Sequence, residues 1–171
     1  MRELFRFPNP VNEVAARSVA GCVVILAALT IVLSATSGTG WLWLTAVLAY
    51  GFLARVLTGP TLSPVGQLAT RVLAPRIGHA KLVPGPPKRF AQAMGAGMSL
   101  AAVVLHFGFG YDTAALVLVG MIAVAATLES AFAFCLGCTV FSALMRAGLI
   151  PEQTCAACND ISLRRTRPAT D

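Results

Sequence analysis

Four of the five cysteines form two Cys-x-x-Cys pairs late in the chain. Cys135 and Cys138 make the first pair, and Cys155 and Cys158 make the second. Two thiols at this spacing can attack a disulfide or accept a sulfane sulfur. Together the four cysteines read C-x2-C-x16-C-x2-C, a spacing typical of tetrathiolate zinc sites. Three interpretations are therefore open: dithiol chemistry, binding of zinc or an iron–sulfur cluster, and packing of small side chains without chemistry.

The residues around the first pair suggest separate roles. A helix is expected to start close to Cys135, and a helix N-terminus lowers the pKa of a nearby thiol. Cys135 is therefore the predicted reactive thiol and Cys138 the predicted resolving thiol. Glu129 lies six residues before Cys135 in an apolar run, where an ionisable group is expensive. It is interpreted either as a proton acceptor for a thiol or as a charge that reaches the surface or pairs with Arg55.

Long apolar helices must position these residues. Of the 171 residues, 57% are hydrophobic and 12% are charged, and the mean hydropathy is +0.76. These values lie outside the range of soluble domains. The apolar runs are long and unbroken, as in transmembrane helices. The net charge of +6 is assigned to the loops of a membrane protein. We expect no nucleic-acid partner, because there is no basic helix with interleaved aromatic residues.

Four apolar runs predict four membrane spans, at about residues 16–35, 41–58, 90–109 and 113–135. Ser63 and Pro64 then signal the start of a helix whose periodicity lasts until Pro75, too short to cross a bilayer. The predicted fold class is all-α: a polytopic membrane protein with four transmembrane helices and an interfacial amphipathic helix between spans two and three. We expect one four-span membrane domain over residues 1–150 and a cytoplasmic, Cys-containing basic tail over residues 151–171.

Local signals suggest how these elements begin and end. Asn9 is predicted to cap the first helix, with Pro10 at its first position. Glu13 lies four residues before Arg17, within reach of a salt bridge. Prolines and glycines make the basic stretch 81–89 a predicted extended connector.

The second half of the chain carries two further signals. Ala93, Gly97 and Ala101 form a stripe of small residues that favours a close helix contact, either within the chain or between the subunits of an oligomer. The apolar run over residues 113–150 is too long for one crossing. It predicts a bend near Gly137 and a short helix at the membrane interface.

The distribution of positive charge predicts the orientation. In a four-span arrangement every lysine and arginine falls on one side of the bilayer, namely Arg2, Arg6, Arg17, Arg55, Arg71, Arg76, Lys81, Lys88, Arg89, Arg146, Arg164, Arg165 and Arg167. By the positive-inside rule this side is cytoplasmic, and both termini and both cysteine pairs lie there. Because the cytoplasm is reducing, a permanent structural disulfide is not expected. Arg55, in the last turn of its span, is expected to snorkel to the headgroups.

Three segments carry a family resemblance: the Pro-Asn-Pro-Val-Asn entry at residues 8–12, the Gly-Pro-Thr-Leu-Ser-Pro segment at 59–64 and the Cys-Leu-Gly-Cys motif at 135–138. Over residues 7–149 the chain resembles a bacterial family of uncharacterised four-helix integral membrane proteins, classed as a domain of unknown function. The resemblance implies a thiol or sulfur-handling role for Cys135 and Cys138. It also implies a cytoplasmic thioredoxin-like or rhodanese-like partner. It does not extend to Cys155 and Cys158.

Overall fold

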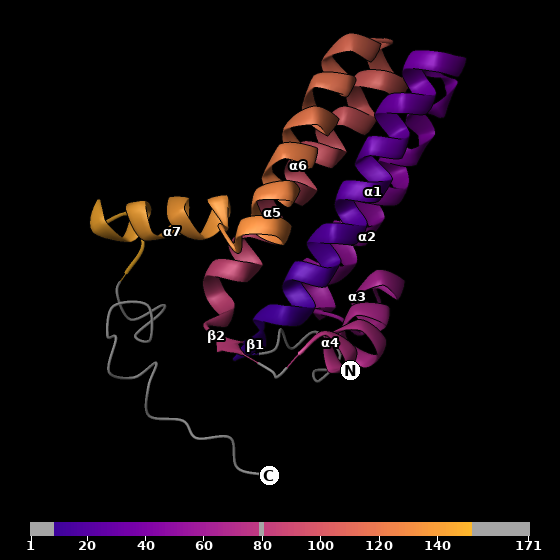
Figure 1. Cartoon of the computed structure of the whole chain (residues 1–171). Coiled ribbons are helices and arrows are strands. Elements are labelled where there is room, and N and C mark those ends of the chain that lie inside the picture. The colour runs from indigo at the N-terminus through magenta and orange to yellow at the C-terminus, as the bar shows by residue number, and fades with distance from the viewer. Residues whose placement is uncertain (1–8, 79–80, 152–171) are drawn as a thin grey trace.

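The computed structural model describes residues 9–78 and 81–151, and four of its helices are long and apolar enough to cross a membrane (Figure 1). The first is α1 (Glu13–Ser37). The second joins a 3₁₀ turn (Thr39–Trp43) to α2 (Leu44–Thr58). The third joins α5 (Gly85–Val103) to a π-helical turn (Val104–Gly108), and the fourth is α6 (Asp112–Phe132). The predicted all-α, four-span membrane architecture is confirmed.

The four long helices form a bundle in which α1 contacts α2 and α6, and α5 contacts the same two helices. Its core contains Val23, Leu48 and Val119. A Cβ atom at Gly95 would lie 2.4 Å from the ring of Phe52, so this glycine allows α5 to approach α2 closely. The predicted stripe of Ala93, Gly97 and Ala101 is exposed instead, and a Cβ atom at Gly97 would meet no other atom within 4 Å. The interpretation of the stripe as a contact within the chain was therefore wrong.

The expected helix between spans two and three is present and longer than predicted. Ser63 caps it as expected, because its Oγ accepts a hydrogen bond from the backbone N–H of Gly66 at 3.1 Å. Helix α3 (Pro64–Leu68) continues through a π-helical turn (69–73) into α4 (Ala74–Ile77). Pro75 does not end the helix. The wider π turn just before this proline accommodates its ring and its missing N–H.

The chain enters α1 differently from the prediction. A short antiparallel pair between β1 (Val11–Asn12) and β2 (Leu82–Val83) keeps the entry extended, so α1 begins only at Glu13. Its cap is Asn12, whose Oδ1 accepts from the backbone N–H of Val14 at 3.0 Å. The predicted cap Asn9 instead accepts from the N–H of Gly85 at 3.1 Å, at the start of α5.

The expected extended connector over residues 81–89 is helical in its second half. Helix α5 begins at Gly85 and carries Pro86 and Pro87 in its first turn. A proline is tolerated there because the first backbone N–H groups of a helix have no partner within it. As a result Lys88 lies inside a helix and is buried.

Two predictions about arginine side chains, the salt bridge of Arg17 and the surface position of Arg55, were also wrong. Glu13 pairs with Lys81, at 2.8 Å between Nζ and Oε2, and not with Arg17. Arg55 does not snorkel to the surface. It is 6% exposed, and its guanidinium lies over the ring of Phe52, 4.7 Å from the centroid.

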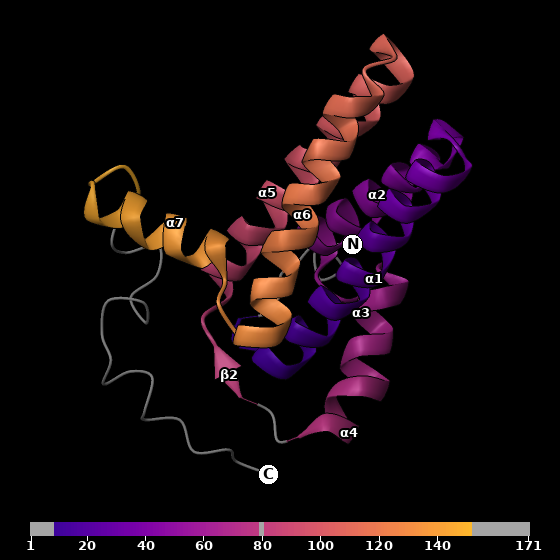
Figure 2. The same ribbon diagram turned by 45° about the horizontal axis from the view of Figure 1, so that its top comes forward.

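Helix α7 (Leu136–Arg146) leaves the bundle sideways after α6, as both ribbon views show (Figures 1 and 2). The predicted bend is present, a few residues earlier than Gly137, at Ala133, whose φ of 57° is left-handed. Phe141 of α7 packs on Phe90 of α5, with ring centroids 5.6 Å apart. This contact holds α7 against the first part of α5.

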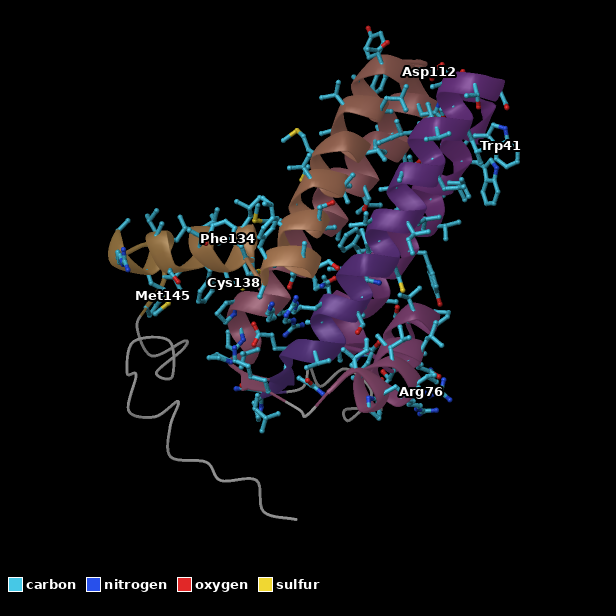
Figure 3. All side chains as sticks on the ribbon, in the orientation of Figure 1. Trp41, Arg76, Asp112, Phe134, Cys138 and Met145 are labelled. Atoms are coloured by element: carbon cyan, nitrogen blue, oxygen red, sulfur yellow. The ribbon has the colours of Figure 1, made fainter. Side chains whose placement is uncertain are left out.

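The two ends of the bundle differ in charge. Figure 3 places Trp41 and Asp112 at one end and Arg76 at the other. The described turns at the Trp41 end, residues 38–43 and 109–111, contain no lysine or arginine. The second end, here called the charged end, holds the entry to α1, α3, α4, β2, the start of α5 and the junction of α6 with α7.

Candidate functional site

The bend after α6 places Cys135 at the cap of α7. The backbone N–H of Phe134 donates to the carbonyl of Leu128 at 3.1 Å, which closes the end of α6. Cys135 is then extended, and its Sγ accepts a hydrogen bond from the backbone N–H of Cys138 at 3.3 Å. Ser, Thr, Asp or Asn usually fills this position. A thiolate at Cys135 would therefore satisfy an orphan N–H and face the positive end of a helix dipole.

The two thiols of the pair are coupled to each other. A hydrogen bond from the Cys138 thiol lowers the pKa of Cys135, and the nearby charge of Lys88 and the Cys138 N–H act in the same direction. Burial and the charge of Glu129 oppose this shift. The pKa of Cys138 is raised, because its proton is held in the hydrogen bond to Cys135 and because its thiol is partly buried. The geometry favours Cys135 as the thiolate and Cys138 as its proton donor.

An ion pair lies beside the thiols. Nζ of Lys88, from the start of α5, is 2.6 Å from Oε1 of Glu129, near the end of α6, and both side chains are largely buried. The predicted alternative partner Arg55 makes no ion pair with Glu129. Among the described residues Glu129 has no hydrogen bond to a thiol, so it acts on Cys135 and Cys138 through its charge. Its proposed role as a proton acceptor stays a prediction.

Arg17 of α1 binds the C-terminal end of α6, next to the bend that leads to Cys135. Its Nε and Nη2 donate to the carbonyl of Ser130 at 3.1 and 2.9 Å, and Nη2 also donates to the carbonyl of Ala131 at 3.3 Å. The last carbonyls of a helix have no partner within it, so this arginine from α1 caps α6 from outside. It fixes the helix end that leads into the bend before Cys135.

Close packing of α7 on α5 explains why the third position of the Cys-Leu-Gly-Cys motif is a glycine, Gly137. A Cβ atom at this residue would lie 2.5 Å from both Cα and Cβ of Ala91 on α5. Only a glycine lets the first turn of α7 lie against the backbone of α5. The contact brings Cys138 near the start of α5, and Figure 3 shows Cys138 at the junction of α7 with the bundle.

The sequence-predicted site residues are only partly brought together. Cys135, Cys138 and Glu129 gather at the junction of α5, α6 and α7. Cys155 and Cys158 lie outside the described residues. The predicted tetrathiolate site therefore stays a prediction. Within the described ranges, no group of three or more His, Cys, Asp or Glu side chains is placed to hold a metal ion.

Sequence reasoning missed Lys88, Arg17 and Gly137 as parts of the site. Lys88 was assigned to a connector because two prolines precede it. Reading those prolines as the first turn of a helix would have placed it on a helix close to the span that holds Glu129. Nothing local in the sequence signals that Arg17 caps α6, since the two contacts join residues more than 110 positions apart.

Comparisons with known proteins place the chain in a family and leave its chemistry open. A family model described as a domain of unknown function (DUF4395) matches residues 11–146. No curated protein and no solved structure matches the chain.

Proposed function

This chain belongs to the DUF4395 family of unknown function, and we propose that it carries a reactive dithiol, Cys135 and Cys138, at one face of a membrane. One observation carries the proposal: Sγ of Cys135 caps α7 and accepts the hydrogen bond of the Cys138 backbone N–H at 3.3 Å. This arrangement stabilises a thiolate on the first cysteine of a Cys-x-x-Cys motif, the form that attacks sulfur. The activity is thiol–disulfide exchange or sulfur relay with a soluble protein.

The face on which the dithiol lies follows from the charge asymmetry. The described turns at the Trp41 end contain no lysine or arginine, whereas the elements at the charged end carry Arg17, Arg76 and Lys88 among others. The positive-inside rule assigns that end to the cytoplasm of a bacterial inner membrane. The partner is then a cytoplasmic thioredoxin-like or rhodanese-like protein. The reducing compartment keeps the dithiol available for the next cycle.

The exchange reaction proceeds in two steps. The Cys135 thiolate attacks one sulfur of a disulfide in the partner, the partner's S–S bond breaks, and one partner sulfur leaves as a thiolate. Cys138 then loses its proton to that thiolate and attacks Sγ of Cys135, which releases the second partner sulfur. The dithiol is oxidised to a disulfide and the partner is reduced by two electrons.

Sulfur relay uses the same nucleophile. The Cys135 thiolate attacks the terminal sulfur of a persulfide in the partner, takes the sulfane sulfur and releases the partner's thiolate. Attack by Cys138 on Sγ of the resulting Cys135 persulfide forms the internal disulfide and releases hydrosulfide. Glu129 and Lys88 set the charge around these steps, and neither side chain forms a bond to sulfur.

Trapping the intermediate tests the proposal. In the Cys138→Ser variant the second step cannot occur, so Cys135 should accumulate a mixed disulfide with oxidised glutathione. Cys135→Ser should lose this adduct, and Cys22→Ser, which changes a half-buried cysteine within α1, should behave like the unchanged protein. Peptide mass mapping identifies the modified cysteine. An unmodified Cys135 in the Cys138→Ser variant would contradict the proposed reaction.

The alternative is a structural metal clip in which Cys135, Cys138, Cys155 and Cys158 bind zinc or an iron–sulfur cluster. Only the spacing of the four cysteines favours it. The Cys155→Ser variant separates the two proposals. A clip should lose metal and stability together, whereas a dithiol should keep its fold in Cys155→Ser and still form the glutathione adduct at Cys135 in the Cys138→Ser/Cys155→Ser variant.

A further inference from the structure

A cavity of about 250 Å³ lies at the charged end, away from the two thiols. It is bounded by the start of α1, the end of α2, the capped turn into α3, and the start of α5. Its apolar walls include Ala15, Val19 and Pro60, and neither Cys135 nor Cys138 lines it. The volume is slightly smaller than the 300–1,000 Å³ of sites for drug-sized ligands. It suits a small organic molecule or one end of a longer one.

Arg55 forms a buried, charged wall of this cavity. Its Nε donates to Oε1 of Gln92 at 2.8 Å, and its Nη1 donates to Oγ of Ser63 at 3.4 Å. No described residue accepts a hydrogen bond from the other terminal nitrogen, Nη2. The partners of Arg55 are therefore neutral, and one face of its guanidinium fork is left for a ligand.

The two buried cations at the cavity differ in whether they have an ion-pair partner. Lys88 also lines it and is also buried. Within the described part of the chain, Glu129 is the carboxylate that faces these two cations, and it makes its ion pair with Lys88 and acts on Arg55 only at longer range. Lys88 thus has a carboxylate partner and also faces the Cys135 thiolate, whereas Arg55 makes no ion pair among the described residues. A buried charge without a counter-ion is unfavourable, so an anion in the cavity would stabilise the folded protein.

We propose that this cavity binds an organic anion, whose carboxylate or phosphate group is held by Nη2 of Arg55 and whose apolar part lies along Ala15 and Val19. A planar guanidinium with free N–H groups is suited to either group. The site is distinct from the dithiol and does not depend on its activity. A free metabolite-like anion and a membrane amphiphile share this chemistry, and the test distinguishes them.

Binding is measured by isothermal titration of the full chain in an uncharged maltoside detergent. The probes are inorganic phosphate, octyl phosphate and octanoate. We expect saturable binding of at least one probe, weakened by about tenfold or more in Arg55→Gln because a charge-assisted hydrogen bond is lost. Arg76→Gln removes an equal charge from an exposed residue at the same end and should bind like the unchanged chain.

The pattern over the probes identifies the source of the ligand. Inorganic phosphate bound as tightly as octyl phosphate would assign the site to a free anion, whereas binding of only the two octyl compounds would assign it to an amphiphile. Ala16→Leu narrows the cavity without changing charge and should also weaken binding. If Arg55→Gln does not fold, the Ala16→Leu variant takes its place as the test of binding in the cavity. The absence of saturable binding, or equal affinity in the Arg55→Gln and unchanged chains, would overturn the proposal.

Discussion

At the scale of single residues, Cys135 occupies the N-cap position of α7, where the hydrogen-bond acceptor is normally a side-chain oxygen. Sulfur is a weak acceptor when protonated and a better one as a thiolate, so the backbone N–H of Cys138 favours the thiolate. The Cys138 thiol adds a second donor and in return keeps its own proton. The asymmetry between two chemically equal cysteines therefore comes from their places in the first turn of α7.

Charge substitutions beside the thiols should change the reactivity of Cys135 in opposite directions. Lys88 lowers the pKa of Cys135 and Glu129 raises it. Lys88→Met should therefore shift the pH profile of iodoacetamide alkylation at Cys135 to higher pH, and Glu129→Gln should shift it to lower pH. Mass mapping of Cys135 over a pH series gives the profile.

The control for these variants is Arg146→Gln, which removes a positive charge from the far end of α7. It should leave the profile in place. Each single variant also leaves a buried charge without its partner, at a cost of about 3–5 kcal/mol in typical buried pairs. The double variant Lys88→Met/Glu129→Gln should be more stable than either single variant. Equal profiles in all three single variants would contradict the electrostatic account.

At the scale of elements, α7 is held by a contact that leaves no room for a side chain at Gly137. Gly137→Ala would bring a Cβ atom to 2.5 Å from the backbone of Ala91, which cannot move without moving α5. We predict a destabilisation of about 1–3 kcal/mol and a change in the alkylation rate of Cys138, because α7 must shift. Thermal unfolding and mass mapping measure these effects.

Gly97→Ala is the matched control for this substitution. It also adds a methyl group to a helical glycine, and a Cβ atom there would meet no other atom within 4 Å. It should leave the thiols unchanged and stabilise α5 slightly, by up to about 1 kcal/mol, through higher helix propensity. Equal effects of the two substitutions would show that the close contact of α7 with α5 does not position the dithiol.

Elements defined by local signals could be predicted from the sequence, and long-range contacts could not. Ser63 caps α3 through its own side chain, and the length of the apolar run after Asp112 requires a bend, so both features follow from nearby residues. Asn9 carries an equally good capping signal, but the pairing of β1 with β2 moves the start of α1 and turns Asn9 toward Gly85. The pair of Lys88 with Glu129 depends on how α5 packs against α6, which no local pattern reports.

At the scale of the whole molecule, the charge asymmetry predicts which end faces the cytoplasm. Single cysteines placed at Thr39 and Gln67 on a cysteine-free background report the two ends. In intact bacterial cells a membrane-impermeant maleimide should label the Thr39→Cys variant, and it should label Gln67→Cys only after permeabilisation. The reverse pattern would place the dithiol on the opposite face and contradict a cytoplasmic partner.

A reversible disulfide between Cys135 and Cys138 is the central claim, and a redox titration of the purified full chain tests it most directly. The protein is equilibrated in glutathione buffers over roughly −320 to −150 mV, its free thiols are alkylated, and the peptides are mapped by mass. We predict one two-electron transition in which both cysteines lose their alkylation together, at the same potential in the Cys155→Ser variant. Full alkylation of both cysteines at every potential would contradict the dithiol function.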